Sequence, residues 1–410
     1  MSIVRHARAF SPVIALSLCA ALSAPAGCAP EASDDLSGAS DSTVGELSSS
    51  TLNARVIAYA STDGSNNGPH QSYGAGVYRA SAGDLAAVGN DLTRVLEIAP
   101  ATRVRVCQND SAPLGTCATY ENLGGSNRVV SVAAGISRIE VRPIIVAYRD
   151  PNFSGVAQGF EIGRYDSLAR IATVGNDTIS SVRVPAGLKV YLCSDDPELT
   201  VGGTCRYVFA NTGQVATDLN DRVSWLNVEP VTTAYRDANF AGVSQNFSPG
   251  TIPVSGLFTL GNDTLTSLVV PEGVVTRACS DDPTNTIGYT CVTFTRSSLQ
   301  VPAALDNQTS WMDISHTVIL SPLNEDSVYT STFTLRGYGV ATSGATIPDA
   351  SLRWYSSVDG YLGTGRKLVA PLSGPATGCG GREHTITLTA TDAQGRVTST
   401  TRVLTVYRIC

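Results

Sequence analysis

Residues 175–181 have the sequence GNDTISS, between two runs that are predicted to be strands. A second copy, GNDTLTS, occupies residues 261–267, and a weaker copy, GNDLTR, occupies residues 89–94. Each copy begins 86 residues after the one before it (175 − 89 and 261 − 175). A fixed period of this length predicts three tandem domains of one kind.

The side chains of this heptapeptide also suggest a ligand. Asn, Asp, Ser and Thr offer only oxygen donors, which suit calcium rather than zinc or copper. The same residue types also build Asx and Ser turns without any metal. A single copy would favour such a turn, whereas recurrence at domain spacing favours calcium.

The composition indicates an all-β chain of several domains. A length of 410 residues allows about two to four domains. Hydrophobic residues make up 42% of the chain, enough to build buried cores, and 38 Gly against 2 Met favour strands and turns over helix bundles. The net charge of −7 argues against a nucleic-acid partner, because phosphate binding needs a basic surface.

The N-terminus has the features of an export signal over residues 1–27. Arg5 and Arg8 precede an apolar core at residues 13–21 that is too short to span a membrane well. The sequence AGC at residues 26–28 resembles the end of a bacterial lipobox, although Pro25 stands where Leu is usual. Two outcomes remain open: a lipid on Cys28, or plain secretion after cleavage behind residue 26. Residues 28–54, rich in Ser, Asp, Ala and Gly, are predicted to form the lipid anchor and a flexible tether.

The cysteines support export. Ten are present, and eight of them pair by position, whereas Cys19 lies in the signal and Cys28 is left over. The predicted disulfides are Cys107–Cys117, Cys193–Cys205, Cys279–Cys291 and Cys379–Cys410. Disulfides require an oxidising compartment, and a lipid would explain the unpaired Cys28.

Strand and turn signals divide the rest of the chain into four domains. Repeats are expected at residues 55–143, 144–230 and 231–315, and a domain of another type at residues 317–410. Many short strands separated by Gly, Pro, Asn and Asp predict β-sandwiches with Greek-key connections. In the last domain, residues 384–390 alternate polar and apolar side chains and Trp354 is placed on a strand.

Two further patterns recur in the second and third repeats. Each repeat opens with two aromatic residues and a glycine: Tyr148, Phe153 and Gly155, then Tyr235, Phe240 and Gly242. The pattern Asn/Asp, Asn/Asp, two free positions, Ser/Thr, Ser is complete at residues 176–181 and 262–267. It returns at residues 220–225 and 306–311, with Trp225 and Trp311 in place of the last Ser.

In these patterns residues 144–315 resemble two microbial βγ-crystallin domains, and residues 55–143 resemble a degenerate third. Residues 317–410 resemble a bacterial immunoglobulin-like domain, through their strand pattern and Trp354. The resemblance implies an all-β chain of tandem βγ-crystallin Greek-key β-sandwiches followed by an immunoglobulin-like β-sandwich.

The resemblance also implies two calcium ions in each intact domain, bound between its two segments. Side chains at the second and fifth positions and the main-chain carbonyl at the third position would be the ligands. In the second domain these residues are Asp177, Thr178, Ser180, Asp221, Arg222 and Ser224. In the third domain they are Asp263, Thr264, Thr266, Asn307, Gln308 and Ser310. So few carboxylates predict a modest affinity.

The first domain is expected not to bind calcium. Arg94 replaces the hydroxyl residue of its first segment, and the corresponding second segment, residues 133–138, keeps only Ser137.

No catalytic constellation is visible in the sequence, since His70, His316 and His384 fall in three different domains. The expectation is a non-enzymatic, calcium-binding cell-surface or extracellular matrix protein, stabilised by Ca²⁺ and exported as a bacterial outer-envelope lipoprotein or secreted. Its membrane contact would be the lipid anchor only. The alternative is an adhesin or a protease inhibitor on the same scaffold, with a surface glycan or protein as partner.

Overall fold

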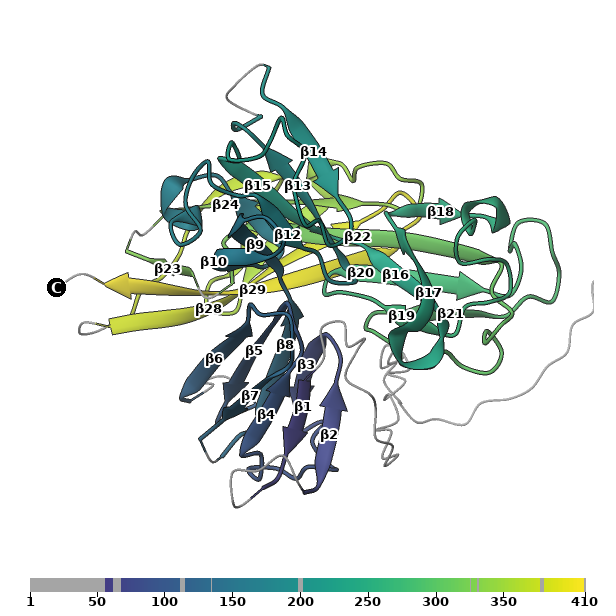
Figure 1. Ribbon diagram of the computed structural model, residues 1–410, viewed down its shortest axis with the longest axis horizontal. Coiled ribbons are helices and arrows are strands. Elements are labelled where there is room, and N and C mark those ends of the chain that lie inside the picture. The colour runs from purple at the N-terminus through teal and green to yellow at the C-terminus, as the bar shows by residue number, and fades with distance from the viewer. Residues whose placement is uncertain are drawn as a thin grey trace, which may run out of the picture. The chain divides into compact units, whose positions relative to one another are not determined.

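The chain folds into β-strands that are joined by turns and short 3-10 helices, which confirms the predicted all-β class (Figure 1). The computed structural model describes residues 56–61, 68–110, 115–133, 135–197, 202–324, 326–329, 332–376 and 380–408. All of these residues belong to one compact unit of the chain. None of the helices in these segments has the length and apolar character that a membrane span requires.

The second repeat is a sandwich of two sheets. One sheet has the order β10-β9-β12 and the other has the order β11-β15-β13-β14. Because β11 follows β10 in the chain but joins the opposite sheet, the connection is a Greek key. A single bridge between Val182 and Thr212 makes the reciprocal crossing. The strands are β9 (Ile145–Asp150), β10 (Ser154–Phe160), β11 (Gly163–Tyr165), β12 (Ser181–Arg183), β13 (Leu188–Cys193), β14 (Cys205–Val208) and β15 (Trp225–Pro230), with the 3-10 helix η1 (Leu168–Ile171).

The third repeat has the same plan. Its sheets are β17-β16-β19 and the β21-β20-β22 part of a six-stranded sheet, with β18 also paired to β22, and its crossing bridge joins Leu268 to Ser298. The elements are β16 (Thr232–Asp237), η2 (Ala238–Phe240), β17 (Ala241–Phe247), β18 (Gly250–Ile252), η3 (Val254–Gly256), β19 (Ser267–Val269), β20 (Val274–Cys279), β21 (Cys291–Phe294) and β22 (Trp311–Ser321).

The first repeat also forms two sheets, with the orders β2-β1-β4-β7 and β3-β8-β5-β6. It differs from the others at β7, which pairs with β4 along four residues where the other repeats have a single bridge. The strands are β1 (Val56–Tyr59), β2 (His70–Tyr73), β3 (Gly76–Arg79), β4 (Val95–Ile98), β5 (Thr102–Cys107), β6 (Cys117–Asn122), β7 (Arg128–Ser131) and β8 (Arg138–Pro143).

Alternation along the strands builds a separate core in each repeat. In β13, for example, Leu188, Val190 and Leu192 are buried between the sheets of the second repeat. Equivalent cores form in the first and third repeats. Each buried aliphatic side chain stabilises its sandwich by roughly 1.5–3 kcal/mol relative to an exposed one.

The residues after the third repeat form a further two-sheet sandwich. Strand β22 runs through the predicted boundary at residue 316 and pairs with β24 (Thr332–Val340), so that one six-stranded sheet, β21-β20-β22-β24-β27 with β18 also on β22, continues from the third repeat into the last sandwich. Trp354 is fully buried in the last core and its indole N–H donates to the carbonyl of Gly365 over 2.7 Å. The immunoglobulin-like assignment stays a prediction.

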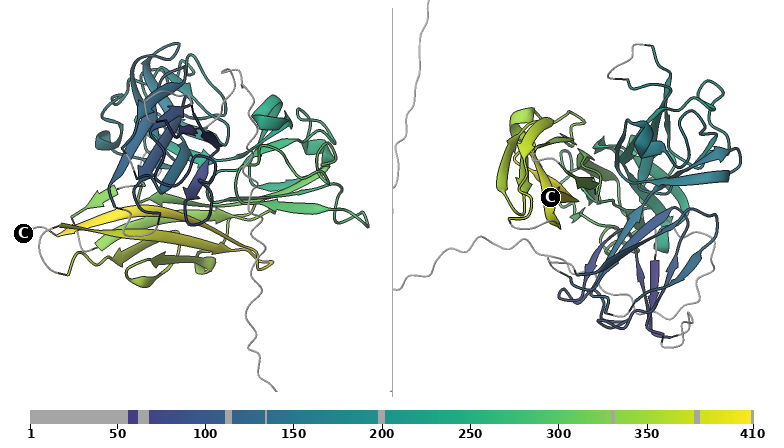
Figure 2. Two further views of the ribbon diagram at one scale, coloured as in Figure 1. Left: turned by 90° about the horizontal axis from the view of Figure 1, so that it is seen from below. Right: turned by 90° about the vertical axis from the view of Figure 1, so that its left-hand side faces the viewer.

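The predicted alternation at residues 384–390 is confirmed, because it lies in β28, which pairs with β29 along twelve positions. Figure 2 shows these yellow strands from two further sides. The elements of this sandwich are β23 (Asp326–Val328), β24 (Thr332–Val340), η4 (Asp349–Ser351), β25 (Leu352–Ser356), β26 (Gly360–Thr364), β27 (Lys367–Pro371), β28 (Gly380–Thr391) and β29 (Val397–Arg408).

Three of the predicted disulfides are confirmed: Cys107–Cys117, Cys193–Cys205 and Cys279–Cys291. Each closes the hairpin at the same place in its repeat. The predicted pair Cys379–Cys410 and the lipid candidate Cys28 lie outside the described residues, as does the predicted export signal. The three disulfides place the protein in an oxidising, exported location.

A tight hairpin joins the first two strands of the second repeat. Asn152 and Phe153 have φ values of 58° and 60°, which are unusual for residues other than glycine. Gly155 follows with φ 76°, and a Cβ there would lie 2.3 Å from a carboxylate oxygen of Asp150. The hydroxyl of Ser181 accepts the N–H of Phe153 over 3.0 Å and donates to the carbonyl of Asp150 over 2.6 Å. The last residue of the heptapeptide thus fixes the hairpin.

Candidate metal centres

In the second repeat the two Asn/Asp-Ser segments cross each other through main-chain hydrogen bonds. The N–H of Asp177 donates to the carbonyl of Val223 over 3.1 Å, and the N–H of Asp221 donates to the carbonyl of Ile179 over 3.3 Å. The exchange is reciprocal, so the two segments are related by a local two-fold arrangement. Residues 44 positions apart (221 − 177) are brought together.

The side chains follow the same reciprocity. The hydroxyl of Ser224 donates to Oδ1 of Asp177 over 2.7 Å, and the hydroxyl of Ser180 donates to Oδ1 of Asp221 over 2.9 Å. Each pair therefore joins the second position of one segment to the fifth position of the other. These are four of the ligands predicted from the sequence, and the structure places them in two adjacent oxygen clusters, which we name the clamp of the second repeat.

The main chain at the second position explains why Asn or Asp stands there. Asp177 and Asp221 have φ values of 55° and 54°, in the left-handed region that only Gly, Asn and Asp adopt readily. Asp263 and Asn307 of the third repeat, with φ values of 54° and 53°, have the same conformation. This geometry lets each carboxylate or amide reach across to the opposite segment.

The residue before each aspartate also contributes to the clamp of the second repeat. The amides of Asn176 and Asn220 donate to Oδ2 of Asp177 and Asp221 over 2.6 and 2.8 Å. Their own carbonyl oxygens, Oδ1, are buried and have no hydrogen-bond partner. An unpartnered buried acceptor costs free energy, so two such oxygens beside two carboxylates fit a site for a cation.

The third positions can contribute only their main-chain carbonyls. The hydroxyl of Thr178 donates to the carbonyls of Val174 and Gly175 over 2.6 and 2.9 Å. The hydroxyl of Thr264 makes the same bonds to Leu260 and Gly261, over 2.6 and 3.0 Å. Arg222 and Gln308 hold the third positions of the second segments, where the predicted ligand is likewise the carbonyl.

The third repeat forms an equivalent clamp with one difference. Asp263 and Asn307 cross by main-chain bonds to Thr309 and Leu265, over 3.1 and 3.0 Å. The hydroxyl of Ser310, at the fifth position of the second segment, donates to Oδ1 of Asp263 over 2.8 Å.

The hydroxyl of Thr266, however, donates to Oδ1 of Asp306 over 2.8 Å, rather than to the predicted ligand Asn307. The sequence interpretation missed Asp306 because it took only the second position of each segment as a ligand. The signal was present, since the first position of this one segment carries a carboxylate where the other three segments carry Asn. The clamp of the third repeat therefore has two carboxylates, on Asp263 and Asp306.

The first repeat retains half of the arrangement. The hydroxyl of Ser137 donates to Oδ1 of Asp91 over 3.0 Å, and the N–H of Asp91 donates to the carbonyl of Ile136 over 3.1 Å. At the other half, Arg94 stands in place of the hydroxyl residue. Its guanidinium donates to the carbonyls of Asp91 and Thr93 over 2.7 and 3.0 Å. A fixed positive charge therefore lies against the carbonyl oxygens of this segment.

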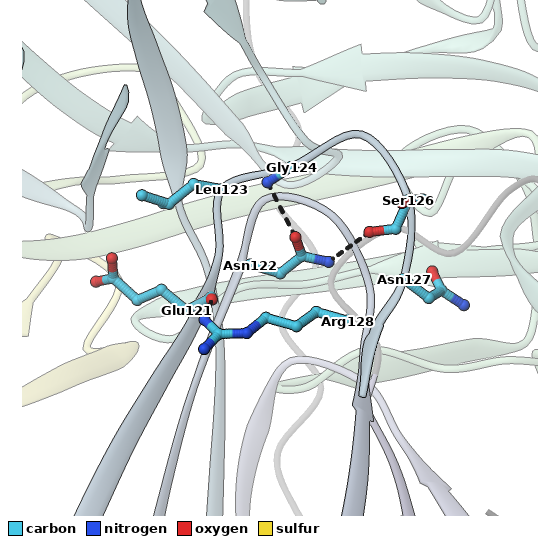
Figure 3. A pocket seen from close by; sticks show the side chains of 7 residues that line it. All are labelled: Glu121, Asn122, Leu123, Gly124, Ser126, Asn127 and Arg128. Carbon is cyan, nitrogen blue, oxygen red and sulfur yellow. Dashed lines mark hydrogen bonds between the residues drawn. The ribbon is translucent and has the colours of Figure 1, made fainter. Parts of the chain in front are cut away.

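Other candidate sites among the described residues have fewer groups that could bind a ligand. No group of three or more His, Cys, Asp or Glu side chains within those ranges could hold a metal ion. An open pocket of about 580 Å³ lies under the loop between β6 and β7 (Figure 3). The side-chain amide of Asn122, which lines this pocket, donates to the carbonyls of Ile98 and Ser126 and accepts the N–H of Gly124. The polar atoms of this side chain are therefore already bonded to the protein itself.

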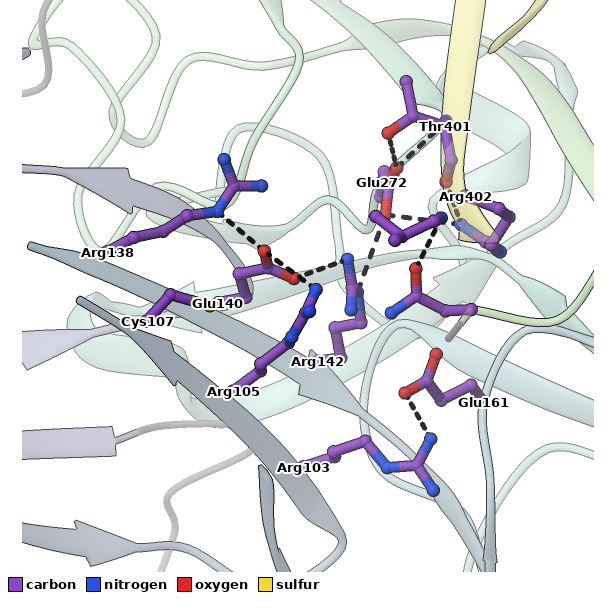
Figure 4. Close-up of polar contacts among 12 residues, drawn as sticks. Arg103, Arg105, Cys107, Arg138, Glu140, Arg142, Glu161, Glu272, Thr401 and Arg402 are labelled. Carbon is purple, nitrogen blue, oxygen red and sulfur yellow. Dashed lines mark hydrogen bonds and ion pairs between the residues drawn. The ribbon is translucent and has the colours of Figure 1, made fainter. Parts of the chain in front are cut away.

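A buried ionic cluster covers one sheet face of the first repeat (Figure 4). Glu140 is fully buried and pairs with Arg138 and Arg142 at 2.7 and 2.9 Å. Burial disfavours the charged form of Glu140, but Arg142, Arg138 and Arg105 outweigh it and hold its pKa below the usual value. The cluster is charge-paired and fits a structural role.

A serine and a histidine also meet in the last sandwich. The hydroxyl of Ser356 accepts the N–H groups of Val358 and Asp359, both over 3.1 Å, and lies 2.9 Å from Nδ1 of His384. With its lone pairs used, the hydroxyl must donate to Nδ1, so that the N–H of Nε2 donates to the carbonyl of Ser373. His384 is fully buried, and the pair therefore acts as a structural bridge between strands.

Comparisons with known proteins give a similarity over one repeat's length. No family model matches the chain, and no curated protein matches it. Among solved structures, the N-terminal domain of protein S is 31% identical, over 21% of this chain and 96% of that chain, with a TM-score of 0.19.

Two further solved structures are similar to this chain to about the same extent. A βγ-crystallin domain from Flavobacterium johnsoniae is 34% identical, over 21% of this chain and 93% of that chain, with a TM-score of 0.19. A βγ-crystallin domain from Clostridium beijerinckii is 31% identical, over 20% of this chain and 95% of that chain, again with a TM-score of 0.19. Two of these three solved structures are βγ-crystallin domains, and the similarity to each of the three covers about the length of one repeat.

Proposed function

We propose that this is a non-enzymatic, exported protein whose second and third repeats bind calcium, and that both repeats belong to the βγ-crystallin family. One observation carries the proposal. In each of these repeats two distant segments cross, and each carboxylate meets the hydroxyl of the opposite segment at 2.7–2.9 Å. Clusters of carboxylate, hydroxyl and carbonyl oxygen are what Ca²⁺ prefers as ligands.

The proposed ligands follow from the clamps. In the second repeat they are the side chains of Asp177, Ser180, Asp221 and Ser224 with the carbonyls of Thr178 and Arg222. In the third repeat they are Asp263, Thr266, Ser310 and Asn307 with the added carboxylate of Asp306, and the carbonyls of Thr264 and Gln308. Two carboxylates for each repeat support a weak affinity, with Kd on the order of 10⁻⁴–10⁻³ M, as in extracellular modules.

Calcium would act here by stabilising the fold. The clamp joins residues from the two halves of a repeat, and the unfolded chain does not hold those residues together. An ion that binds only the folded form stabilises it by RT ln(1 + [Ca²⁺]/Kd). A calcium-rich exterior and the three disulfides would then protect the same exported protein.

The setting of the protein completes the proposal. We place it on the outer envelope of a bacterium or in its surroundings, held by a lipid on Cys28 or secreted. The last sandwich, for which we retain an immunoglobulin-like assignment, would act with the first repeat as a scaffold beside the calcium-binding repeats.

A calorimetric titration of the full chain with Ca²⁺ tests this proposal. We expect four ions for each chain, two in each clamp. Asp177→Ala and Asp263→Ala should each remove one ion from their own repeat, because each substitution leaves the other carboxylate–hydroxyl pair of the clamp in place. The matched control is Asp91→Ala, the equivalent substitution in the first repeat, which should leave the titration unchanged. A titration that Asp91→Ala alters and Asp177→Ala does not would refute the assignment.

The capture of a protein partner, as in a protease inhibitor, is a second candidate function. The loop between Cys279 and Cys291 favours it, because Ile287 on this loop is fully exposed while a disulfide closes the loop at its base. Inhibition of secreted proteases that is lost in Ile287→Ser would support this function, and cleavage of the loop by those proteases without inhibition would contradict it.

A further inference from the structure

Two large apolar side chains protrude from the clamp end of the third repeat. Phe258 is 82% exposed and Ile287 is fully exposed, the two most exposed large hydrophobic residues of the described chain. Exposed apolar residues scattered singly need no explanation. These two are different because both belong to loops that lead directly into one clamp.

The hydrogen bonds show this connection. Phe258 lies in the turn that ends in the heptapeptide, where the N–H of Gly261 donates to the carbonyl of Leu257 over 2.7 Å. The loop of Ile287 begins at Cys279, whose carbonyl accepts the N–H of Ser310 over 3.0 Å. Ser310 in turn bonds Asp263. The two loops therefore flank the same carboxylate–hydroxyl pair.

The internal repeats show that the fold does not require Phe258. The equivalent positions, 86 and 172 residues earlier, hold Ala172 and Ala86 (258 − 86 and 172 − 86). The preceding residue is buried in all three repeats, as Leu85, Ile171 and Leu257, whereas Ala86 and Ala172 are exposed as Phe258 is. An aromatic ring thus replaces a methyl group at a solvent-facing position in one repeat only.

The loop of Ile287 is held in shape by its own bonds. The carboxylate of Asp282 accepts the N–H of Thr284 over 2.8 Å and the amide of Asn285 over 2.6 Å. Its main-chain carbonyl accepts the N–H of Thr286 over 3.0 Å. Because these bonds and the disulfide order the loop, little conformational entropy is lost when Ile287 is buried against a partner.

Charge links the apolar side chains to calcium. The clamp carries Asp263 and Asp306, and the adjoining loop carries Asp281 and Asp282, a formal charge of −4. Four carboxylates beside Phe258 and Ile287 oppose the transfer of this end into an apolar medium, because charges are costly to desolvate. Two Ca²⁺ ions would cancel this charge.

We propose that the calcium-loaded third repeat docks onto a phospholipid bilayer, with Phe258 and Ile287 entering its interfacial layer. This inference rests on the proposed calcium binding. Each side chain protrudes from its own turn, an arrangement that a fluid bilayer accepts without a complementary pocket. A stable protein interface would instead need about 1,000 Å² or more of fitted surface. Two inserted side chains give a reversible contact, since firm anchoring needs a second signal.

Flotation of the full chain with vesicles of phosphatidylethanolamine and phosphatidylglycerol in equal parts tests the docking. The Cys28→Ser background is used so that no lipid on that residue carries the protein. We expect flotation with Ca²⁺ and none with a chelator. Phe258→Ala, the residue of the other repeats, should weaken the partition about ten-fold, and Ile287→Ser should do the same. Tyr361→Ala, which removes an exposed ring from the last sandwich, should float as the parent does.

Calorimetry on the same samples separates the two proposals. Bound Ca²⁺ without flotation would overturn the docking and leave the proposed function standing, and so would calcium-dependent self-association without flotation. Flotation that is unchanged in Phe258→Ala and Ile287→Ser would also overturn it. The absence of bound Ca²⁺ would overturn both proposals. Calcium binding that survives in Phe258→Ala while flotation is lost is the result that supports the docking.

Discussion

At the scale of single residues, the second position of each crossing segment determines what the clamp can do. A left-handed main chain there favours Gly, Asn or Asp, and of these only Asn and Asp also bring an oxygen across to the other segment. The sequence pattern therefore predicts this position well. It does not predict the pairing of Thr266 with Asp306, because the choice between neighbouring oxygens depends on the side-chain rotamers of the folded repeat.

A second single residue, His316, makes the stability of the folded protein depend on pH. It lies in β22 and is 2% exposed. Burial, with repulsion from Lys189, lowers its pKa to about 3. The unfolded chain, where His has an ordinary pKa near 6.5, therefore binds a proton that the folded chain excludes, and stability falls as the pH drops below about 6.5.

The expected loss from this residue between pH 7 and pH 5 is about 2 kcal/mol. Denaturant unfolding at the two pH values measures it. His316→Phe keeps an aromatic ring against Tyr338 and removes the titrating group, so its stability should change less over the same range. An equal loss in parent and variant would show that another group is responsible.

At the scale of elements, the tight hairpin between β9 and β10 depends on Gly155. A methyl group there would meet the carboxylate of Asp150 at 2.3 Å, in a conformation of φ 76°. We expect Gly155→Ala to destabilise the second repeat by roughly 2–4 kcal/mol, from left-handed strain and the displaced carboxylate together.

The chain offers a matched control for this prediction. Gly83 has nearly the same φ, 78°, but a Cβ there would meet nothing within 4 Å. Gly83→Ala should therefore lower the stability only through the strain of a left-handed main chain, by about 1 kcal/mol. Thermal unfolding of both variants compares them, and equal losses would mean that the contact with Asp150 contributes nothing.

At the scale of the whole molecule, periodicity made most of the fold predictable. The 86-residue repeat, the alternating strands and the local disulfides are all short-range features of the sequence. The ionic cluster around Glu140 and the passage of β22 into the last sandwich are not, because they depend on which faces of distant strands are covered. The strand pattern of residues 317–410 likewise predicts a β-sandwich. It does not predict that this sandwich shares strand β22 with the third repeat.

The clamps also act at this scale, since each ties the two halves of a repeat together. The most direct test is the melting temperature of the full chain with and without Ca²⁺, for the parent and for Asp177→Ala combined with Asp263→Ala. At calcium about ten-fold above Kd, each ion contributes roughly 1.4 kcal/mol, or a few degrees for a repeat of this size. The account predicts that calcium raises the parent's melting temperature about twice as much as that of the double variant, which keeps one carboxylate–hydroxyl pair in each clamp. Equal gains in both proteins would contradict it, because the ion would then be bound somewhere other than the clamps.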